Sequence, residues 1–258
     1  MPRPERGPGA SMPFLDHLEE LRWRLIWSAV AVMACSIAGF FIVTKLDVIG
    51  ILQRPITPLL PGQKLLFTSP TEPIAITLKL SLVIGLILAL PVVIYHVWAF
   101  VSPALFEREK KAVIPAIGGA FVLFLLGVAM AYFLVLPLGL RFLLSFQAQA
   151  LEPIITIGEY LRFATRMILA FGAIFELPLV SVVLASLGLI TPETLKRYRR
   201  HSIVGIAVLS AVLTPADVGS MLMMMLPLVL LYEFSIFLVR LVVRDRRPVA
   251  ENPQPTTD

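Results

Sequence analysis

A short acidic segment near the N-terminus carries the first residues that could do chemistry. Residues 14–25 read FLDHLEELRWRL, with the carboxylates ahead of the basic residues. Carboxylates in the first turns of a helix are favoured by its dipole. The helix could be an anchor at a membrane interface, or it could bind a cationic partner through acids such as Glu20, close to Arg22. Its apolar side chains recur every three or four positions and predict a helical stripe of Phe14, Leu18, Leu21 and Leu25.

A second acidic segment, residues 98–111, reads WAFVSPALFEREKK. Pro103 predicts a tight turn, with Phe100 before it and the acids Glu107 and Glu109 after it. This turn could be a solvated loop whose exposed ion pairs contribute about 0–1 kcal/mol each. If both acidic segments lie on one side of a membrane, their carboxylates could instead form a seat for guanidinium groups, which favour planar, bidentate acid partners.

Glu176 is an acid inside a long apolar stretch. It lies in the segment FGAIFELP, residues 171–178, and no other charge separates it from Arg166. An ionisable group within a membrane span is costly, so such a residue is functional by default. Pro178 cannot donate a hydrogen bond to the carbonyl of Ile174 and therefore predicts a disturbed helix. The structural alternative is a protonated or water-bridged Glu176 side chain that satisfies this break.

Catalytic and metal-binding sequence patterns are absent. His17, His96 and His201 lack ligand spacing, and Cys35 is the one cysteine. The chain has no GxSxG, HExxH or phosphate-binding glycine motif. We therefore expect neither an enzyme nor a bound cofactor or metal. Basic loops facing a cytoplasm account for the net charge of +5, so no nucleic-acid partner is expected.

The composition shows which elements must position these residues. Of 258 residues, 58% are apolar and 15% are charged, which argues strongly against a water-soluble globular enzyme. Uncharged apolar stretches predict membrane spans, which need about 20 residues each. The fifth stretch has only 13 residues, or about 20 Å of helix, against a hydrocarbon core of about 30 Å. The predicted spans are 25–43, 80–101, 112–140, 167–190, 202–214 and 221–239.

The distribution of Lys and Arg predicts the orientation. Segments on the side of the two termini hold 15 of these residues in 64 positions, against 7 in 68 on the other side. The positive-inside rule therefore places both termini in the cytoplasm. Four spans plus a re-entrant hairpin of the last two stretches would fit equally well, but six spans are favoured.

The segments outside the predicted spans differ in character. The external loops, 44–73 and 141–162, are long enough to form a structured cap. The N-terminal and C-terminal tails, 1–13 and 244–258, are polar and expected to be disordered. A six-helix transmembrane domain over residues 14–243 remains between them.

Five sequence blocks resemble those of a known family. They follow the family's order and fall at the expected loops and spans. Taken together with the spans between them, they are similar to TatC, the large membrane subunit of the twin-arginine protein translocase, over roughly residues 14–243. The blocks are HLEELRWRL (17–25), VWAFVSPALFEREKK (97–111), FGAIFELP (171–178), LITPETLKRYRR (189–200) and LTPADVGS (213–220).

The resemblance implies an all-α, concave, glove-like fold of six transmembrane helices, with the last two short and both termini in the cytoplasm. It implies a multi-pass protein of the cytoplasmic membrane that binds twin-arginine signal peptides. It also implies that the chain moves folded proteins across the membrane with the proton-motive force, in an oligomeric complex with single-span subunits of the TatA and TatB types.

The resemblance also assigns individual residues. Glu20 and Glu109 match the acids that bind the twin arginines, and Arg22 and Phe100 belong to the same region. Family members often have one acid where this chain has both Glu107 and Glu109, so which of these two receives the arginines stays open. The remaining matches are Pro55 in the first external loop, Glu176 inside the membrane, and Asp217 in the third external loop, where it is also placed to cap the next helix.

Two other functions remain to be weighed. Glu176 and Glu233, both within predicted spans, would suit a proton-coupled carrier of small solutes, but the chain lacks the internal repeat that marks many carriers. An intramembrane enzyme would need a nucleophile or metal ligands that the sequence does not offer.

Overall fold

The computed structural model describes residues 14–60, 65–101, 113–145, 155–214 and 218–244. Within these residues the secondary structure is helical, apart from one isolated β-bridge between Leu66 and Thr156. This confirms the all-α fold. Five segments are long and apolar enough to cross a membrane: His17–Lys45, Glu72–Phe100, Ile117–Ser145, Ile157–Ser186 and Val218–Val242.

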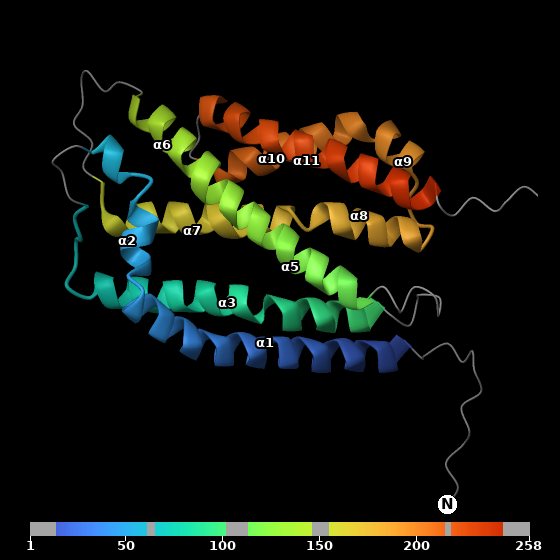
Figure 1. The fold of residues 1–258 in the computed structure, drawn as a ribbon, viewed down its shortest axis with the longest axis horizontal. Helices are drawn as coiled ribbons and strands as arrows, with labels where there is room; N and C mark the ends of the chain where they lie inside the picture. The colour runs from blue at the N-terminus through green and yellow to red at the C-terminus, as the bar shows by residue number, and fades with distance from the viewer. Residues whose placement is uncertain (1–13, 61–64, 102–112, 146–154, 215–217, 245–258) are drawn as a thin grey trace, which may run out of the picture.

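The first two long helices form an antiparallel pair along one side of the molecule (Figure 1). They are α1 (Phe14–Lys45) and α3 (Glu72–Val101). Gly39 and Gly85 let the two backbones approach closely. A Cβ atom on Gly85 would lie 2.5 Å from the Cα atom of Ser36, and one on Gly39 would overlap a backbone oxygen of α3. Because α1 is continuous, the acidic N-terminal segment and the first span belong to one rigid element.

The third crossing is built from three consecutive pieces, which together run diagonally across the molecule in Figure 1. They are α5 (Val113–Met130), the π-helix η3 (Ala131–Val135) and α6 (Leu136–Ser145). The wider π turn accommodates an extra residue without ending the helix. Ala131 and Leu136, at its two ends, are fully buried.

The fourth crossing is broken where the sequence predicts. Two residues, Phe175 and Glu176, separate the end of α7 (Ile157–Ile174) from the start of α8 (Leu177–Ser186). Pro178 occupies the first turn of α8, where a residue without an N–H is tolerated. The backbone N–H of Glu176 instead bonds to the carbonyl oxygen of Ala173 at 3.2 Å, one residue short of the α-helical pattern.

The C-terminal part contains α9 (Pro192–Arg197), α10 (Arg199–Leu213) and α11 (Val218–Arg244). Helix α10 has 15 residues, or about 22 Å, so the fifth helix is short as expected. The expectation that the sixth helix is also short is wrong, since α11 has 27 residues. It is longer than the apolar stretch 221–239 because it begins at Val218 and continues through the basic residues Arg240 and Arg244.

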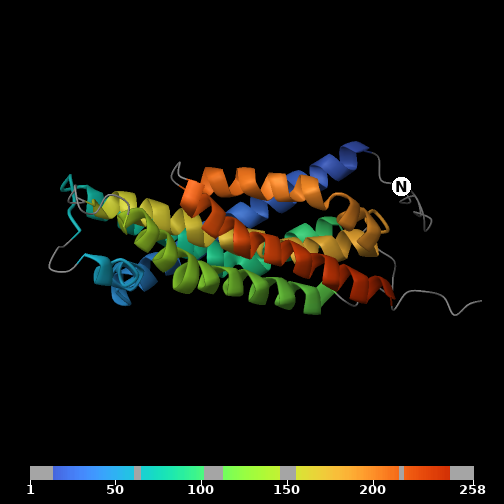
Figure 2. The same ribbon diagram turned by 90° about the horizontal axis from the view of Figure 1, so that it is seen from above.

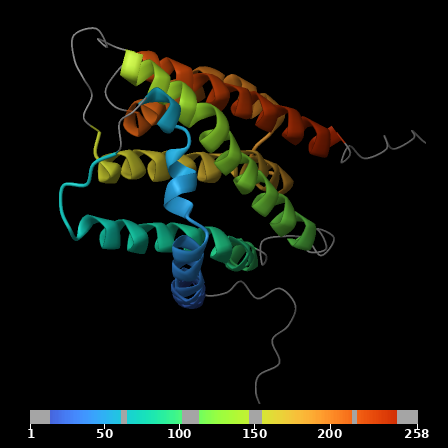
Figure 3. The ribbon, with the colours of Figure 1, turned by 60° about the vertical axis from the view of Figure 1, so that its left-hand side comes forward.

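A small cap closes one end of the bundle, which we call the cap end. It comprises α2 (Val48–Gln53) and the 3₁₀-helix η1 (Thr57–Leu59), and α2 runs across this end of the molecule (Figure 3). The hydroxyl of Tyr132 donates to the carbonyl oxygen of Ile51 at 2.7 Å, and that of Tyr160 donates to the carbonyl oxygen of Leu52. The structured loop predicted after the first span is thus confirmed for the residues described.

The other end is the open end, where α1 begins and α3 and α11 finish. The start of α1 and the finish of α11 lie at the same end of the molecule in Figure 2. The main hydrophobic core gathers toward the cap end, around residues such as Ile56, Leu80, Leu136, Met167 and Phe171. Fewer residues of this core lie at the open end, where Ile236 and Val239 of α11 are buried outside it.

Candidate functional site

The first acid predicted to function, Glu20, lies in the second turn of α1 at the open end. It forms an ion pair with Arg24, one helical turn further on. The Arg24 Nε atom donates to Glu20 Oε1 at 2.9 Å, and Nη2 contacts the same oxygen. About a quarter of each side chain is exposed, 23% for Glu20 and 24% for Arg24. This carboxylate is therefore partly withdrawn from water, which strengthens its hydrogen bonds to cations.

The second carboxylate oxygen of Glu20, Oε2, does not share the bonds to Arg24. Oε2 is buried and has no hydrogen-bond partner among the described residues, and His17 Nδ1 lies 3.9 Å from it. A buried acceptor without a donor is unfavourable by about 1–3 kcal/mol. Glu20 thus keeps unused capacity to accept a hydrogen bond.

Phe100 is brought to Glu20 through His17. The rings of His17 and Phe100 stack with their centroids 4.2 Å apart and their planes 14° from parallel. This contact joins the beginning of α1 to the end of α3. The sequence places Phe100 and Glu20 eighty positions apart, so the antiparallel α1–α3 pair is what unites them. We call His17, Glu20, Arg24 and Phe100 the acidic corner.

Other residues predicted for this site are placed differently. Arg22 is exposed and makes no ion pair with any residue that the structure describes. Glu107, Glu109 and Pro103 lie outside the described residues, in the segment that follows Val101 at the end of α3. Asp217 also lies outside them, between α10 and α11.

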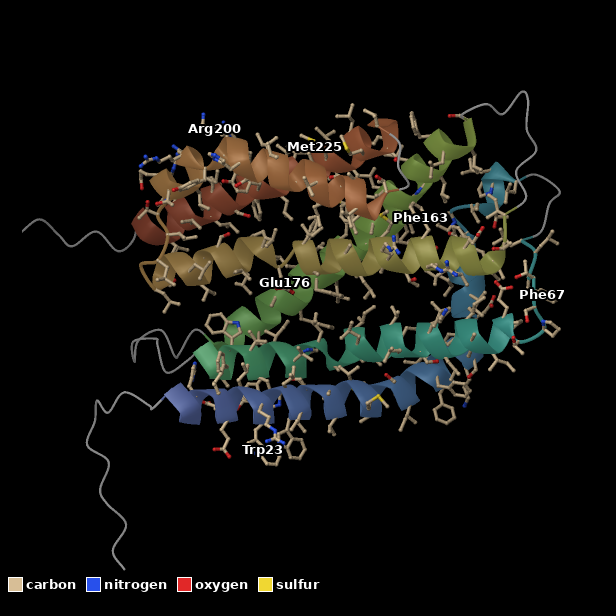
Figure 4. All side chains as sticks on the ribbon, turned by 180° about the vertical axis from the view of Figure 1, so that it is seen from behind. Trp23, Phe67, Phe163, Glu176, Arg200 and Met225 are labelled. Atoms are coloured by element: carbon tan, nitrogen blue, oxygen red, sulfur yellow. The ribbon has the colours of Figure 1, made fainter. Side chains whose placement is uncertain are left out.

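Glu176 forms a separate site at the break between α7 and α8, near the middle of the molecule's length (Figure 4). Its Oε1 atom is buried without a hydrogen-bond partner in the described structure. The side chain borders an apolar cavity of about 270 Å³ between α3, α5 and α8, whose lining includes Trp98, Ala120 and Val183. The carboxyl group therefore meets an apolar surface with one acceptor unused.

The last turns of α3 touch both sites. Phe100 stacks on His17 at the acidic corner, and Trp98 lines the cavity that holds Glu176. Residues two positions apart on a helix point about 200° apart, so these two rings leave α3 on nearly opposite sides. The acidic corner and the Glu176 cavity are therefore neighbours across one helix.

Pro55 belongs to neither site. It lies in the turn between α2 and η1 at the cap end, half-buried beside the fully buried Ile56. The structure thus gives Pro55 a role in shaping the cap. No group of three or more His, Cys, Asp or Glu side chains that could hold a metal occurs among the residues described.

Sequence reasoning missed an ion pair between two helices. Arg199 at the start of α10 donates through Nε to Glu233 Oε1 of α11 at 2.5 Å, and Tyr232 donates through its hydroxyl to the carbonyl oxygen of Leu195. These contacts fasten α9 and α10 to α11 at the open end. The Glu20–Arg24 pair could have been found from its i,i+4 spacing with the acid first. The Arg199–Glu233 pair has no such signal.

Comparison with known proteins identifies the family. Residues 16–227 match the family described as "Sec-independent protein translocase protein (TatC)". The chain belongs to the TatC family. The TatC protein of Aquifex aeolicus is 42% identical over 240 residues, which cover 92% of this chain and 99% of that protein. The TatC protein of Escherichia coli K12 is 34% identical over 238 residues, 92% of this chain and 92% of that protein.

A solved structure supports the same conclusion. The crystal structure of the twin arginine translocase receptor TatC is 43% identical, covers 88% of this chain and 100% of that chain, and superimposes with a TM-score of 0.79. The TatC relationship makes this chain a multi-pass membrane component of a Sec-independent protein translocase, which implies partner subunits. The family resemblance stated from the sequence blocks is confirmed.

Proposed function

We propose that this chain is the receptor subunit that binds twin-arginine signal peptides at its open end. The observation that carries the proposal is the acidic corner. There a partly buried carboxylate, Glu20, keeps one oxygen without a donor beside the stacked rings of His17 and Phe100. A planar guanidinium can bond to a carboxylate and lie against aromatic rings at the same time, whereas an ammonium group lacks the planar fork.

Two arginines require a second acid. We propose Glu109 for this role, with Glu107 as the alternative beside it, since both belong to the segment that directly follows α3. Arg22, exposed on α1 next to the acidic corner, would then border the same site. The apolar stretch of a signal peptide has an apolar surface to follow, because Leu18, Leu21 and Leu25 of α1 are 42–68% exposed.

The open end is proposed to face the cytoplasm in the cell membrane. The excess of Lys and Arg on the side of both termini supports this orientation through the positive-inside rule. The transmembrane domain would span residues 14–243, with cytoplasmic tails at 1–13 and 244–258.

Single-span subunits of the TatA and TatB types are the proposed partners. Helix α10 offers them an apolar face, since Val204, Val208 and Val212 recur at four-residue spacing and are 60–66% exposed. Glu176 offers a second contact, where a polar group of a partner helix could donate to the unused oxygen. Transport of folded proteins is proposed to draw on the proton-motive force.

Binding of a labelled peptide tests the receptor proposal. The purified full-length chain should bind a peptide containing Arg-Arg followed by an apolar stretch at least tenfold more tightly than its Lys-Lys counterpart, because about 1.4 kcal/mol of added hydrogen bonding gives that ratio. Glu20→Gln and Glu109→Gln should each remove this preference, and Glu107→Gln shows which neighbouring acid is used.

Glu19→Gln is the matched control for these variants. Glu19 is also an acid in the first turns of α1, but it is exposed and makes no ion pair among the described residues. It should bind the Arg-Arg peptide as the unmodified chain does. Equal affinity of the unmodified chain for both peptides, or full binding by Glu20→Gln, would overturn the receptor proposal.

Transport tests the remainder of the proposal. Membrane vesicles carrying this chain together with TatA- and TatB-type subunits should export a folded reporter bearing the Arg-Arg signal, and an uncoupler should stop export. Glu176→Gln should reduce export while leaving peptide affinity unchanged, since Glu176 lies outside the acidic corner. Export that continues in the presence of an uncoupler would contradict the energy source.

A further inference from the structure

The acid proposed to receive the signal peptide already holds a guanidinium. Arg24 places Nε 2.9 Å from Glu20 Oε1 and brings Nη2 to the same oxygen. These are the chemical group and the type of contact that an arginine of the ligand would offer. The spacing is built into α1, because Glu20 and Arg24 are one helical turn apart with the acid first, the favourable order on a helix.

Burial explains why a resident cation is needed. Only 23% of the Glu20 side chain is exposed, and its Oε2 atom is already buried without a donor. A carboxylate in this position without any partner would be strongly destabilising. Arg24 neutralises it while the site is empty, so a bound ligand need not be present for α1 to be stable.

We propose that Arg24 is an internal competitor, which leaves Glu20 when an arginine of the signal peptide binds and returns when that peptide departs. This inference rests on the proposed receptor function. Oε2 alone offers too few acceptor sites for a bidentate contact, so the incoming guanidinium must also take the oxygen that Arg24 occupies. Arg24 thereby becomes a residue that sets the strength of peptide binding without contacting the peptide in the bound state.

Competition has a definite thermodynamic signature. A tethered competitor weakens the ligands that must displace it. An ammonium group has no fork and can bond to Oε2 alone, so a Lys-Lys peptide need not displace Arg24. Removing Arg24 should therefore strengthen binding of the Arg-Arg peptide more than binding of the Lys-Lys peptide, and Arg24 should favour release of a bound arginine by replacing it.

Two substitutions separate this role from others. Arg24→Lys keeps the charge but loses the fork, and Arg24→Gln loses both. With the full-length chain and the labelled Arg-Arg peptide, affinity should rise from the unmodified protein to Arg24→Lys and again to Arg24→Gln. We expect a total gain of about two- to fivefold, the upper part of the range for an ion pair on a helix surface. The Lys-Lys peptide should gain less, because its ammonium groups can bond to Oε2 without displacing Arg24.

A rise in Arg24→Lys cannot come from net charge, which that substitution preserves. Arg200→Gln is a second control for charge, because Arg200 lies on the side of the molecule opposite Trp23 and α1 (Figure 4). It should leave peptide affinity unchanged. In a Glu20→Gln background, Arg24→Lys should also have no effect, since the pair that it perturbs is gone.

The outcomes distinguish the two proposals. If the unmodified chain does not prefer the Arg-Arg peptide, or keeps it after Glu20→Gln, the receptor function itself fails. If that preference depends on Glu20 but affinity falls or stays constant in Arg24→Lys and Arg24→Gln, only the competitor role fails. A fall would then assign Arg24 to holding Glu20 in its binding position.

Discussion

The cap end and the open end of this molecule satisfy their polar groups in different ways. At the cap end, hydroxyls of Tyr132 and Tyr160 reach carbonyl oxygens more than eighty residues away in the chain, and the core packs beneath them. At the open end, Glu20 Oε2 is buried without a donor among the described residues, and nearer the middle of the molecule so are Glu176 Oε1 and Ser210 Oγ. The cap end is thus held by hydrogen bonds between distant residues, and the open end keeps an unused carboxylate oxygen.

This difference supports the proposed binding site at the open end. Ligand sites are drawn from the parts of a protein with fewer stabilising contacts, because binding must supply what the free protein lacks. The rings of Trp23 and Trp27 on α1 are more than half exposed and add apolar surface beside the proposed site.

Gly85→Val should separate α1 from α3 and have the largest effect on stability. The added Cβ atom would lie 2.5–2.6 Å from the backbone of Ser36, so α1 and α3 must separate. We expect about 3 kcal/mol of destabilisation and loss of the stacking between His17 and Phe100, measured as a lower melting temperature and weaker peptide binding. Gly118→Ala is the control, because a Cβ atom there meets nothing within 4 Å. A melting temperature equal to that control would refute the close-packing argument.

Tyr160→Phe should weaken the cap end while sparing the open end. Tyr160 is 3% exposed, and its hydroxyl is the donor to the carbonyl of Leu52, so its loss should lower the unfolding free energy by about 1–3 kcal/mol. Tyr132→Phe removes a more exposed bond to Ile51 and should have a smaller effect. Peptide affinity should not change in either variant, and a fall in affinity would show that the two halves are energetically coupled.

Glu176→Leu should raise the stability of the chain and lower its transport activity. It replaces a buried acceptor that has no donor with an apolar side chain facing an apolar cavity. We expect the chain to be about 1 kcal/mol more stable and slower in the export assay. Lower stability would instead mean that the carboxyl group satisfies the break between α7 and α8.

Arg199→Gln and Glu233→Gln should have the smallest effects. The pair joins α10 to α11, but its side chains are 55% and 35% exposed, so water screens the attraction. A double-mutant cycle on the melting temperature should give a coupling close to the error of measurement. A large coupling energy would mean that this ion pair stabilises the open end strongly, which would weaken the contrast between the two ends.

The sequence predicted the features that depend on local pattern. Apolar runs located the spans, Pro178 marked the break after Ile174, and the short stretch 202–214 gave the short helix α10. The predicted last span, 221–239, ends before α11 does, because basic residues at a membrane edge can continue a helix. The acid positions along α1 also predicted Glu20 as a candidate site residue, and the structure shows it paired with Arg24 with one oxygen unused.

Features that depend on distant contacts were not predictable in this way. Nothing in the local pattern tells that Tyr160 reaches Leu52, that His17 meets Phe100, or that Arg199 pairs with Glu233. Each needs the helices to be placed first. The π turn at 131–135 is likewise invisible to periodicity, since its composition matches the helices on both sides.

The position of Trp98 and Phe100 on opposite sides of the last turns of α3 has a mechanical consequence. Because the same turns of α3 carry both rings, a peptide that displaced Phe100 in the proposed receptor would also move Trp98 at the cavity around Glu176. Under the proposed function, occupancy of the peptide site would thereby alter a surface on the other side of the same helix, where a partner subunit could make contact.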